Sequence, residues 1–136
     1  MAIKKVNNKP QWTYQGKTDF KIPENAIGFT YRIDVLDSPF YYYYGKKNLT
    51  STRGRGKKAV TTESAWRNYE SSSKELKALI KAGKKIKKEI LKFCFSKAEL
   101  SYEECKIIIC DRALEDSNCL NKWVTLKVWE HQLKTK

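Results

Sequence analysis

The alternation of apolar and polar residues predicts two neighbouring β-strands in the first third of the chain. Residues 27–36, IGFTYRIDVL, are rich in β-branched and aromatic side chains, which is typical of a strand. Residues 37–39, DSP, favour a turn, and residues 40–46, FYYYYGK, have the composition of a second strand. The pattern therefore predicts a β-hairpin with a short connection. A shorter strand is expected around QWTYQ, residues 11–15.

Capping residues and helical spacing predict two helices in the second half of the chain. Ser72 and Glu75 have the spacing of a capping box that opens the apolar-periodic segment SKELKALIKAG, residues 73–83. The final glycine of that segment is a natural stop for a helix. Ser96 and Glu99 repeat the capping spacing and predict a second, longer helix that reaches residue 115 and packs on the sheet.

Four further segments have less regular patterns. Residues 90–95, ILKFCF, are short and aromatic and favour a strand between the two helices. Residues 48–64 are rich in Gly, Ser, Thr, Lys and Arg and predict an exposed, mobile basic loop. Residues 63–70, ESAWRNYE, suit a short helix, and residues 123–129, WVTLKVW, suit either a final strand or a last short helix.

The order of these elements predicts an α+β fold with a small antiparallel β-sheet flanked by helices. A chain of 136 residues is the length of one compact domain. We expect a loosely attached arm over residues 1–25, the domain itself over residues 26–130, and a frayed tail over residues 131–136.

The charge balance points to a polyanionic partner. The formal net charge is +13, from 28 Lys and Arg against 15 Asp and Glu. Such an excess favours nucleic acid, because each neutralised phosphate releases condensed counterions. A soluble protein with a lysine-coated surface is the alternative that charge alone leaves open.

Apolar runs and cysteine spacing exclude other classes of protein. No window approaches the roughly 20 apolar residues of a membrane span, and no apolar run follows the N-terminal charges as in a signal peptide. The expected setting is cytoplasmic, in the host cell if a phage encodes the chain, with no membrane partner. Four cysteines without a CxxC pair, and a single histidine, favour reduced buried thiols over a zinc site. These cysteines are Cys94, Cys105, Cys110 and Cys119.

Two triplets in the predicted hairpin resemble the hallmark of the GIY-YIG nuclease superfamily. Residues 29–31, FTY, stand at the first triplet, and residues 43–45, YYG, stand at the second. The first triplet has its glycine one position early, at Gly28, and the second has Tyr44 in place of isoleucine.

Later motifs follow the order of small phage-encoded members related to free-standing homing endonucleases. Residues 65–76, AWRNYESSSKEL, are similar to a W-x-x-Y-x-G-S-S-x-x-L stretch in which Ser71 replaces the glycine. Residues 102–106, YEECK, resemble the helix segment with the metal-binding glutamate, and residues 118–123, NCLNKW, resemble the late asparagine motif. The resemblance implies a metal-dependent DNA endonuclease of phage or mobile-element type that hydrolyses phosphodiester bonds with Mg²⁺ or Mn²⁺. A catalytically inactive nucleic-acid-binding protein on the same fold is the alternative.

The resemblance also implies a set of catalytic residues. Glu104 would bind the metal, and helical spacing places it on the face of Leu100 and Ile108, towards the sheet. Glu103, its neighbour, is the alternative carboxylate. Tyr31 would accept the proton of the attacking water and Tyr43 would hydrogen-bond nearby, unless both rings only pack across the strands.

The tyrosine run has two faces, because residues two apart in a strand share a side. Tyr41 and Tyr43 should therefore point one way, and Tyr42 and Tyr44 the other. One set is expected in the core and the other at the site.

A cation and an asparagine complete the implied site. Arg67 is the residue expected to contact the scissile phosphate, with Arg53, Arg55 or Lys47 as alternatives. Tyr69 stands where relatives have a histidine or tyrosine beside that arginine. Asn121 matches the late asparagine, with Asn118 as its competitor. The residues expected to contact nucleic acid are Lys46, Lys47, Arg53, Arg55, Lys57, Lys58 and Tyr69.

Overall fold

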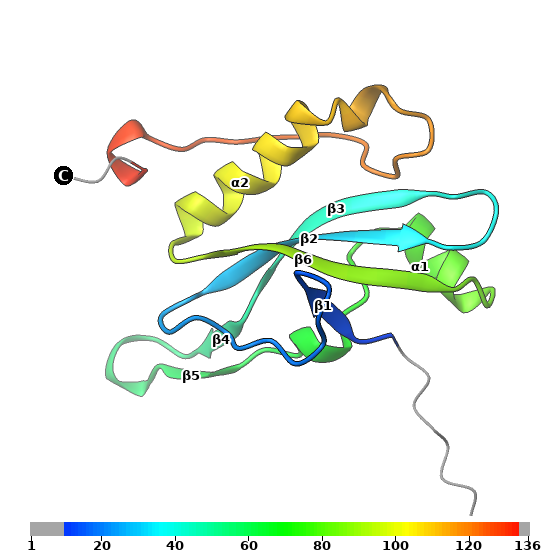
Figure 1. Ribbon diagram of the computed structural model, residues 1–136. Helices are drawn as coiled ribbons and strands as arrows, with labels where there is room; N and C mark the ends of the chain where they lie inside the picture. The colour runs from blue at the N-terminus through cyan, green and yellow to red at the C-terminus, as the bar shows by residue number, and fades with distance from the viewer. Residues whose placement is uncertain (1–9, 134–136) are drawn as a thin grey trace, which may run out of the picture.

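The computed structural model describes residues 10–133 and shows an α+β fold built on a four-stranded sheet (Figure 1). The strands are β1 (Trp12–Tyr14), β2 (Gly28–Val35), β3 (Tyr42–Asn48) and β6 (Ile86–Cys94), in the order β1-β6-β2-β3. Strand β2 is antiparallel to both of its neighbours, as predicted. Strand β1 pairs in parallel with β6, so the sheet is mixed rather than purely antiparallel.

Two helices pack on opposite faces of this sheet. Helix α1 (Lys74–Lys81) places Leu76 in the core that also holds Phe29 and Tyr31, whereas helix α2 (Lys97–Cys110) places Ile108 against Tyr44. The predicted faces of the tyrosine run are therefore correct. Tyr43 packs with the first core and Tyr44 with the second, because consecutive strand residues point to opposite sides.

The helix caps agree with one prediction and correct the other. Ser96 Oγ accepts a hydrogen bond from the Glu99 amide at 3.1 Å, as the capping box predicts. Helix α1 instead begins one residue later than expected, because the side chain of Ser73, not Ser72, accepts from the Leu76 amide. Helix α2 ends at Cys110, short of residue 115, where the backbone turns into the left-handed region at Arg112.

The N-terminal segment is tied to the core from Trp12 onwards. The indole of Trp12 is 3 % exposed and donates to the carbonyl of Trp66 at 2.7 Å. The predicted strand around residues 11–15 is confirmed. The described part of the segment, residues 10–25, is not loosely attached as its polar composition led us to expect, and residues 1–9 of the expected arm lie outside the described residues. Tyr14, Phe20 and Ile22 also pack against the core, so several apolar side chains hold the segment in place.

The segment expected to be an exposed basic loop is largely exposed, but most of it has regular structure. Residues 48–64 contain a β-hairpin of strands β4 (Thr50–Arg53) and β5 (Val60–Glu63), joined through a 3₁₀ turn at Gly56–Lys58. The predicted helix over residues 63–70 is reduced to a single 3₁₀ turn, Trp66–Asn68.

The C-terminal segment also departs from prediction. Residues 123–129 form neither a strand nor a helix, and Trp123 and Trp129 remain exposed at 71 % and 60 %. The apolar alternation there has no sheet to pair with. Only a 3₁₀ turn, Glu130–Gln132, follows, and residues 134–136 of the expected tail lie outside the described residues. Within residues 10–133, no helix is both long and apolar enough to cross a membrane.

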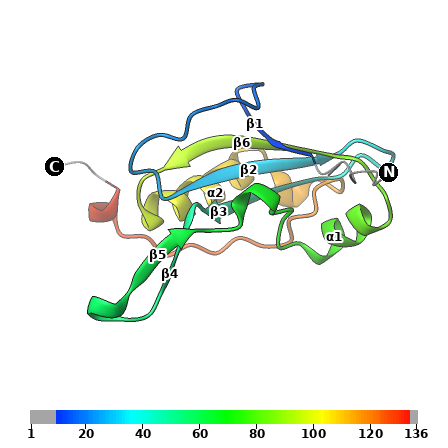
Figure 2. The ribbon, with the colours of Figure 1, turned by 90° about the horizontal axis from the view of Figure 1, so that it is seen from below.

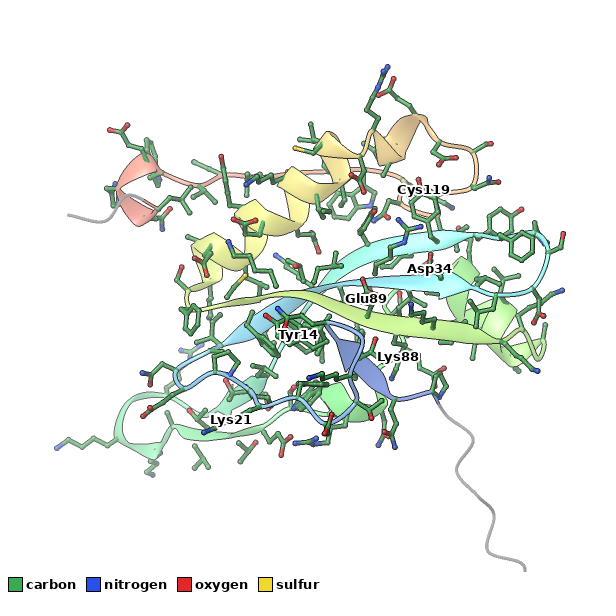
Figure 3. The ribbon with its side chains drawn as sticks, viewed as in Figure 1. Tyr14, Lys21, Asp34, Lys88, Glu89 and Cys119 are labelled. Atoms are coloured by element: carbon green, nitrogen blue, oxygen red, sulfur yellow. The ribbon has the colours of Figure 1, made fainter. Side chains whose placement is uncertain are left out.

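The four cysteines are all free, as expected, but they are not all buried. Cys94 and Cys105 are buried, Cys119 is half-buried beside β3 (Figure 3), and Cys110 is exposed at the end of α2. In the described part of the chain, no three His, Cys, Asp or Glu side chains gather at one place.

Candidate active site

The ring of Tyr31 lies against Gly45 on the neighbouring strand. The two residues are partners in the β2–β3 pair, and a Cβ at position 45 would lie 2.4 Å from the Tyr31 hydroxyl oxygen. Only glycine leaves room for the phenol in this position. The glycine of the second triplet thus has a physical role, which is to let the tyrosine of the first triplet extend across β3.

Three tyrosine rings gather on this face of the sheet. The ring of Tyr31 lies 6.3 Å from that of Tyr43 and 5.9 Å from that of Tyr69, between centroids. The Tyr31 hydroxyl shares hydrogen bonds with the side chains of Tyr69 and Ser71. The Tyr43 hydroxyl lies 3.5 Å from Ser72 Oγ. Tyr31 is 1 % exposed, so it is part of the core as well as of this cluster.

Burial decides the protonation of these phenols. Burial, and then the neighbouring Tyr69, raise the pKa of Tyr31 far above its ordinary value. Burial also raises the pKa of Tyr43, against the opposing effect of its hydrogen bond to Ser72. Both side chains are neutral phenols near pH 7 unless a cation lies close enough to favour the phenolate.

Glu104 reaches the same region from α2. The helix packs closely because β2 has Gly28, where a Cβ would lie 2.7 Å from Leu100 Cδ2. Leu100 and Ile108 are buried on the inner face of α2, and Glu104 lies on that face between them, as its spacing predicts. Glu104 and Tyr43 both line a cavity of about 340 Å³ at the edge of β3.

The surroundings of the two neighbouring glutamates distinguish their roles. Glu103 forms an ion pair with Lys92 Nζ at 3.0 Å, outside the cavity. Burial raises the pKa of Glu104, and Lys46 opposes this shift. No hydrogen bond or ion pair satisfies Glu104 within the part of the chain that the structure describes. Of the two carboxylates, Glu104 is the one available to a ligand.

The side chain of Asn121 is hydrogen-bonded to the backbone of β3. Its side chain accepts from the Tyr44 amide and donates to the Tyr44 carbonyl, both at 2.8 Å. The competitor Asn118 uses its backbone, which donates to Asp116 Oδ1 and accepts from the Tyr42 amide. Both asparagines therefore hold the C-terminal segment against the edge of the sheet, and Asn121 does so next to the cavity that it also lines.

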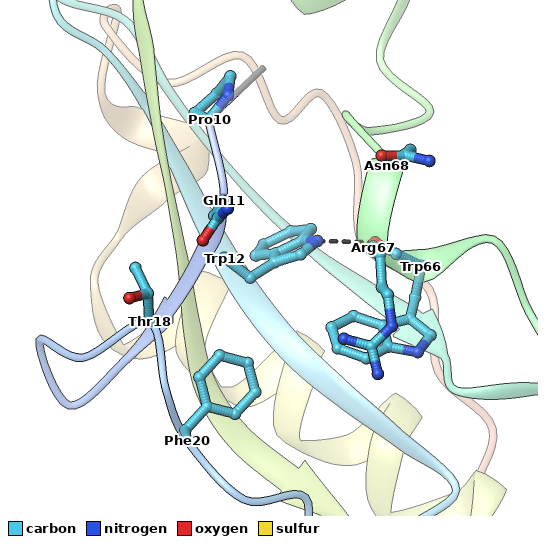
Figure 4. Close-up of a pocket in the computed structure, with 8 residues that line it drawn as sticks. All are labelled: Pro10, Gln11, Trp12, Thr18, Phe20, Trp66, Arg67 and Asn68. Atoms are coloured by element: carbon cyan, nitrogen blue, oxygen red, sulfur yellow. Dashed lines mark hydrogen bonds between the residues drawn. The ribbon is translucent and has the colours of Figure 1, made fainter. Parts of the chain in front are cut away.

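Arg67 does not join these residues. Its guanidinium pairs with Glu63 at 3.0 Å, stacks on Trp66 at 4.3 Å from the ring centroid, and remains largely exposed. Figure 4 shows it at a different hollow, of about 320 Å³, with Trp12 and Phe20. The insertion after β3 makes the alignment with the family motif ambiguous, which explains why the sequence alone favoured Arg67.

Other basic residues lie closer to the tyrosines and Glu104. Lys46 donates to Ser101 Oγ on α2 at 2.8 Å and acts on the pKa of Glu104. The ammonium of Lys47 lies 4.5 Å from the centroid of the Tyr69 ring. Arg55, Lys57 and Lys58 are exposed at the tip of the β4–β5 hairpin, and the side chain of Arg53 lies outside the described part of the structure.

Two residues near the site carry roles that the sequence analysis did not assign. Ser71 is buried with φ +98°, a conformation that favours glycine, and its hydroxyl bonds to the Ser73 amide at 2.9 Å. Lys88, labelled in Figure 3, is 1 % exposed and donates to the Tyr69 carbonyl at 3.0 Å. Its strand parity with Ile86 and Ile90, both buried, is a signal that could have identified it.

The donor chemistry at Glu104 fits a hard divalent cation. Mg²⁺ keeps most of its waters and binds through one or two carboxylates, so a single partly buried carboxylate without a protein partner suits it. The cavity also contains polar oxygens of Tyr43 and Ser72 that can bond to such waters.

One comparison with known proteins found a match. The family model described as "Putative endonuclease segE, GIY-YIG domain" matches residues 12–124, which begin at β1 and end just after Asn121. No curated protein and no solved structure matches the chain. Because the matched region contains the whole sheet, both helices and the cavity, the chain belongs to this GIY-YIG endonuclease-domain family.

Proposed function

We propose that the protein is a metal-dependent DNA endonuclease that hydrolyses phosphodiester bonds. The observation that carries this proposal is that Glu104 and Tyr43, from opposite cores of the fold, line one cavity. Family membership supports a nuclease, and the net charge of +13 supports a nucleic-acid substrate. The resemblance to small phage-encoded members supports a phage or mobile-element origin.

Glu104 would hold Mg²⁺ or Mn²⁺, which when bound supplies positive charge to the phosphoryl oxygens and lowers the pKa of a bound water. Tyr43 would orient the attacking water through its hydroxyl, with Ser72 as its hydrogen-bond neighbour. Tyr31 could accept the water's proton only as a phenolate, which would require a nearby cation to offset the burial that raises its pKa. Asn121 would hold the cavity wall to β3 rather than contact the reacting atoms.

The cation that meets the scissile phosphate is proposed to be Lys46. Its side chain lies beside α2 and influences Glu104, whereas Arg67 is committed to Glu63 and Trp66 elsewhere. Lysine acts on phosphate as a point charge without the bidentate geometry of arginine.

The alternative function, a nucleic-acid-binding protein without catalysis, has one specific observation in its favour. Among the side chains that the structure describes, no guanidinium lines the cavity, and Arg67 lines a different hollow. Under this alternative the positive surface would still bind DNA, but metal ions would have no effect on the DNA.

A plasmid assay separates the two functions. Supercoiled plasmid is incubated with wild type, Glu104→Ala or Glu103→Ala, each with Mg²⁺ and with EDTA. Glu103→Ala is the matched control, because it removes an adjacent carboxylate that is paired with Lys92 outside the cavity. We expect Mg²⁺-dependent nicking by wild type and Glu103→Ala, and none by Glu104→Ala. Plasmid retention without nicking by any of the three proteins would refute the proposal in favour of the alternative.

A further inference from the structure

The β4–β5 hairpin stands apart from both cores of the protein. Every side chain that the structure describes from Thr50 to Glu63 is exposed, and Val60 reaches 59 %. Figure 2 shows the hairpin projecting away from the sheet and helices. A two-stranded ribbon without a buried face gains little from packing and is at best marginally stable alone. The described side chains of the hairpin therefore remain exposed to solvent rather than contributing to either core.

The base of the hairpin is nevertheless attached firmly to the domain. Leu49 is buried immediately before β4, and its carbonyl accepts from the Ser64 amide at 2.9 Å. Ser64 Oγ also donates to the Asn48 carbonyl. At the end of β5, Glu63 accepts from the Trp66 indole at 2.8 Å. These contacts set the direction in which the hairpin leaves the body.

The geometry points to an interaction with duplex DNA. We propose that the β4–β5 hairpin enters the major groove of the DNA substrate, beside the bond that is cut. This inference rests on the proposed function and adds how the substrate is held.

The dimensions of a two-stranded ribbon select the groove. Paired strands lie about 4.8 Å apart, and with side chains they fit the roughly 12 Å width of the major groove but not the roughly 6 Å of the minor groove. Arg55, Lys57 and Lys58 at the tip bring positive charge to the flanking phosphates. Behind them, Thr62 and Val60 offer hydroxyl and methyl groups, which are suited to base edges and the thymine methyl group.

The length of chain between the cavity and the tip of the hairpin limits the distance between them. Strand β3 carries Tyr43 and leads through Leu49 into β4. The 12 residues from Tyr43 to Arg55 span at most about 40 Å, close to one turn of B-DNA at about 34 Å. The hairpin would therefore contact bases within about one helical turn of the scissile phosphate, which gives the nuclease a means of sequence preference without a separate DNA-binding domain.

Two triple variants test this interaction. In the first, Arg55, Lys57 and Lys58 are all replaced by alanine. In the matched control, three exposed lysines from other parts of the fold, Lys17, Lys81 and Lys106, are replaced by alanine, which removes the same charge. Thermal unfolding of each variant checks that the substitutions leave the stability of the fold unchanged. Binding to a fluorescent 30-base-pair duplex is measured by anisotropy in EDTA, so the result does not depend on catalysis.

We expect the major-groove ligand methyl green to displace wild type and the control variant, and the minor-groove ligand netropsin to displace neither. The hairpin variant should bind the duplex at least tenfold more weakly. The slope of the logarithm of the association constant against the logarithm of the salt concentration should become shallower by up to about 2.7, or about 0.9 for each lost phosphate contact. Equal affinities of the two variants, or displacement of wild type by netropsin alone, would overturn the inference.

The plasmid assay keeps the two proposals separate. Metal-dependent nicking together with equal binding by both variants would refute the hairpin's role and leave the nuclease function intact. Methyl green-sensitive binding through the hairpin without any nicking would support the hairpin's role and refute catalysis.

Discussion

Gly45 lies opposite Tyr31 in the β2–β3 pair, so close that a Cβ would lie 2.4 Å from the Tyr31 hydroxyl oxygen. The relationship joins the two triplets of the family motif in one physical contact. Tyr31 can extend across β3 only because its partner has no side chain, and its hydroxyl then meets Tyr69 and Ser71. The position of the phenol therefore depends on a residue that performs no chemistry.

Gly45→Ala should displace the Tyr31 ring and destabilise the protein by about 1–3 kcal/mol, the usual cost of overpacking a filled core. Urea unfolding of the variant measures this loss. The matched control is the pair Tyr31→Ala and Tyr31→Ala/Gly45→Ala, in which the ring is already gone. Gly45→Ala should cost much less in that background, and equal costs in both backgrounds would show that the contact is unimportant.

Ser71 adopts φ +98°, and its hydroxyl accepts from the Ser73 amide at 2.9 Å. Ser71→Ala and Ser71→Gly both remove the hydroxyl, but only glycine relieves the backbone. The glycine variant should therefore be more stable than the alanine variant by about 1–2 kcal/mol. Chemical denaturation of the two variants side by side tests this order, and a more stable alanine variant would contradict the strain.

Asn121→Ala should destabilise the protein by about 1–3 kcal/mol, because it removes two hydrogen bonds and leaves the Tyr44 amide and carbonyl without that partner. Asn118→Ala is the control, since Asn118 holds β3 through its backbone. Denaturation midpoints should fall for the first variant and change little for the second. Equal losses would mean that the side chain of Asn121 has no special role.

Alkaline pH should weaken the fold through its buried phenols. Burial, and then the hydrogen bond to Asp111, raise the pKa of Tyr44 from its ordinary 10.0 to about 12. A pKa raised in the folded state gives stability that is complete below pH 10 and is lost as pH rises towards 12, because the unfolded chain releases the proton first. Urea unfolding at pH 8 and pH 11 should show a smaller loss for Tyr44→Phe than for wild type. Identical losses would exclude a contribution from Tyr44.

Local patterns predicted the elements that carry the site. The strand residues 27–36, the cap at Ser96 and the two faces of the tyrosine run follow from periodicity and capping, which are local properties. The hairpin over residues 48–64 was missed because its exposed strands lack apolar alternation. Arg67 was misplaced because its position depends on how the chain returns after that hairpin, which is a long-range property.

The β6 strand and the C-terminal segment also show that long-range contacts are not predictable from local patterns. β6 runs from Ile86, earlier than the aromatic stretch that predicted it, because its first residues pair with the end of β2, which is a long-range contact. Residues 123–129 alternate like a strand but pair with no strand, so Trp123 and Trp129 stay exposed while Val124 packs against the core around Tyr44 and Ile108.

The proposed function requires Tyr43 and Glu104 to act in one catalytic centre. Its most direct test is the initial rate of Mg²⁺-dependent plasmid nicking by wild type, Tyr43→Phe, Glu104→Ala and the double variant. If both side chains act on the same reacting group, their effects will not multiply, and the double variant should be about as slow as Glu104→Ala alone, at least about 100-fold below wild type. A double variant whose loss equals the product of the two single losses, or a Glu104→Ala protein that cuts at the wild-type rate, would contradict it.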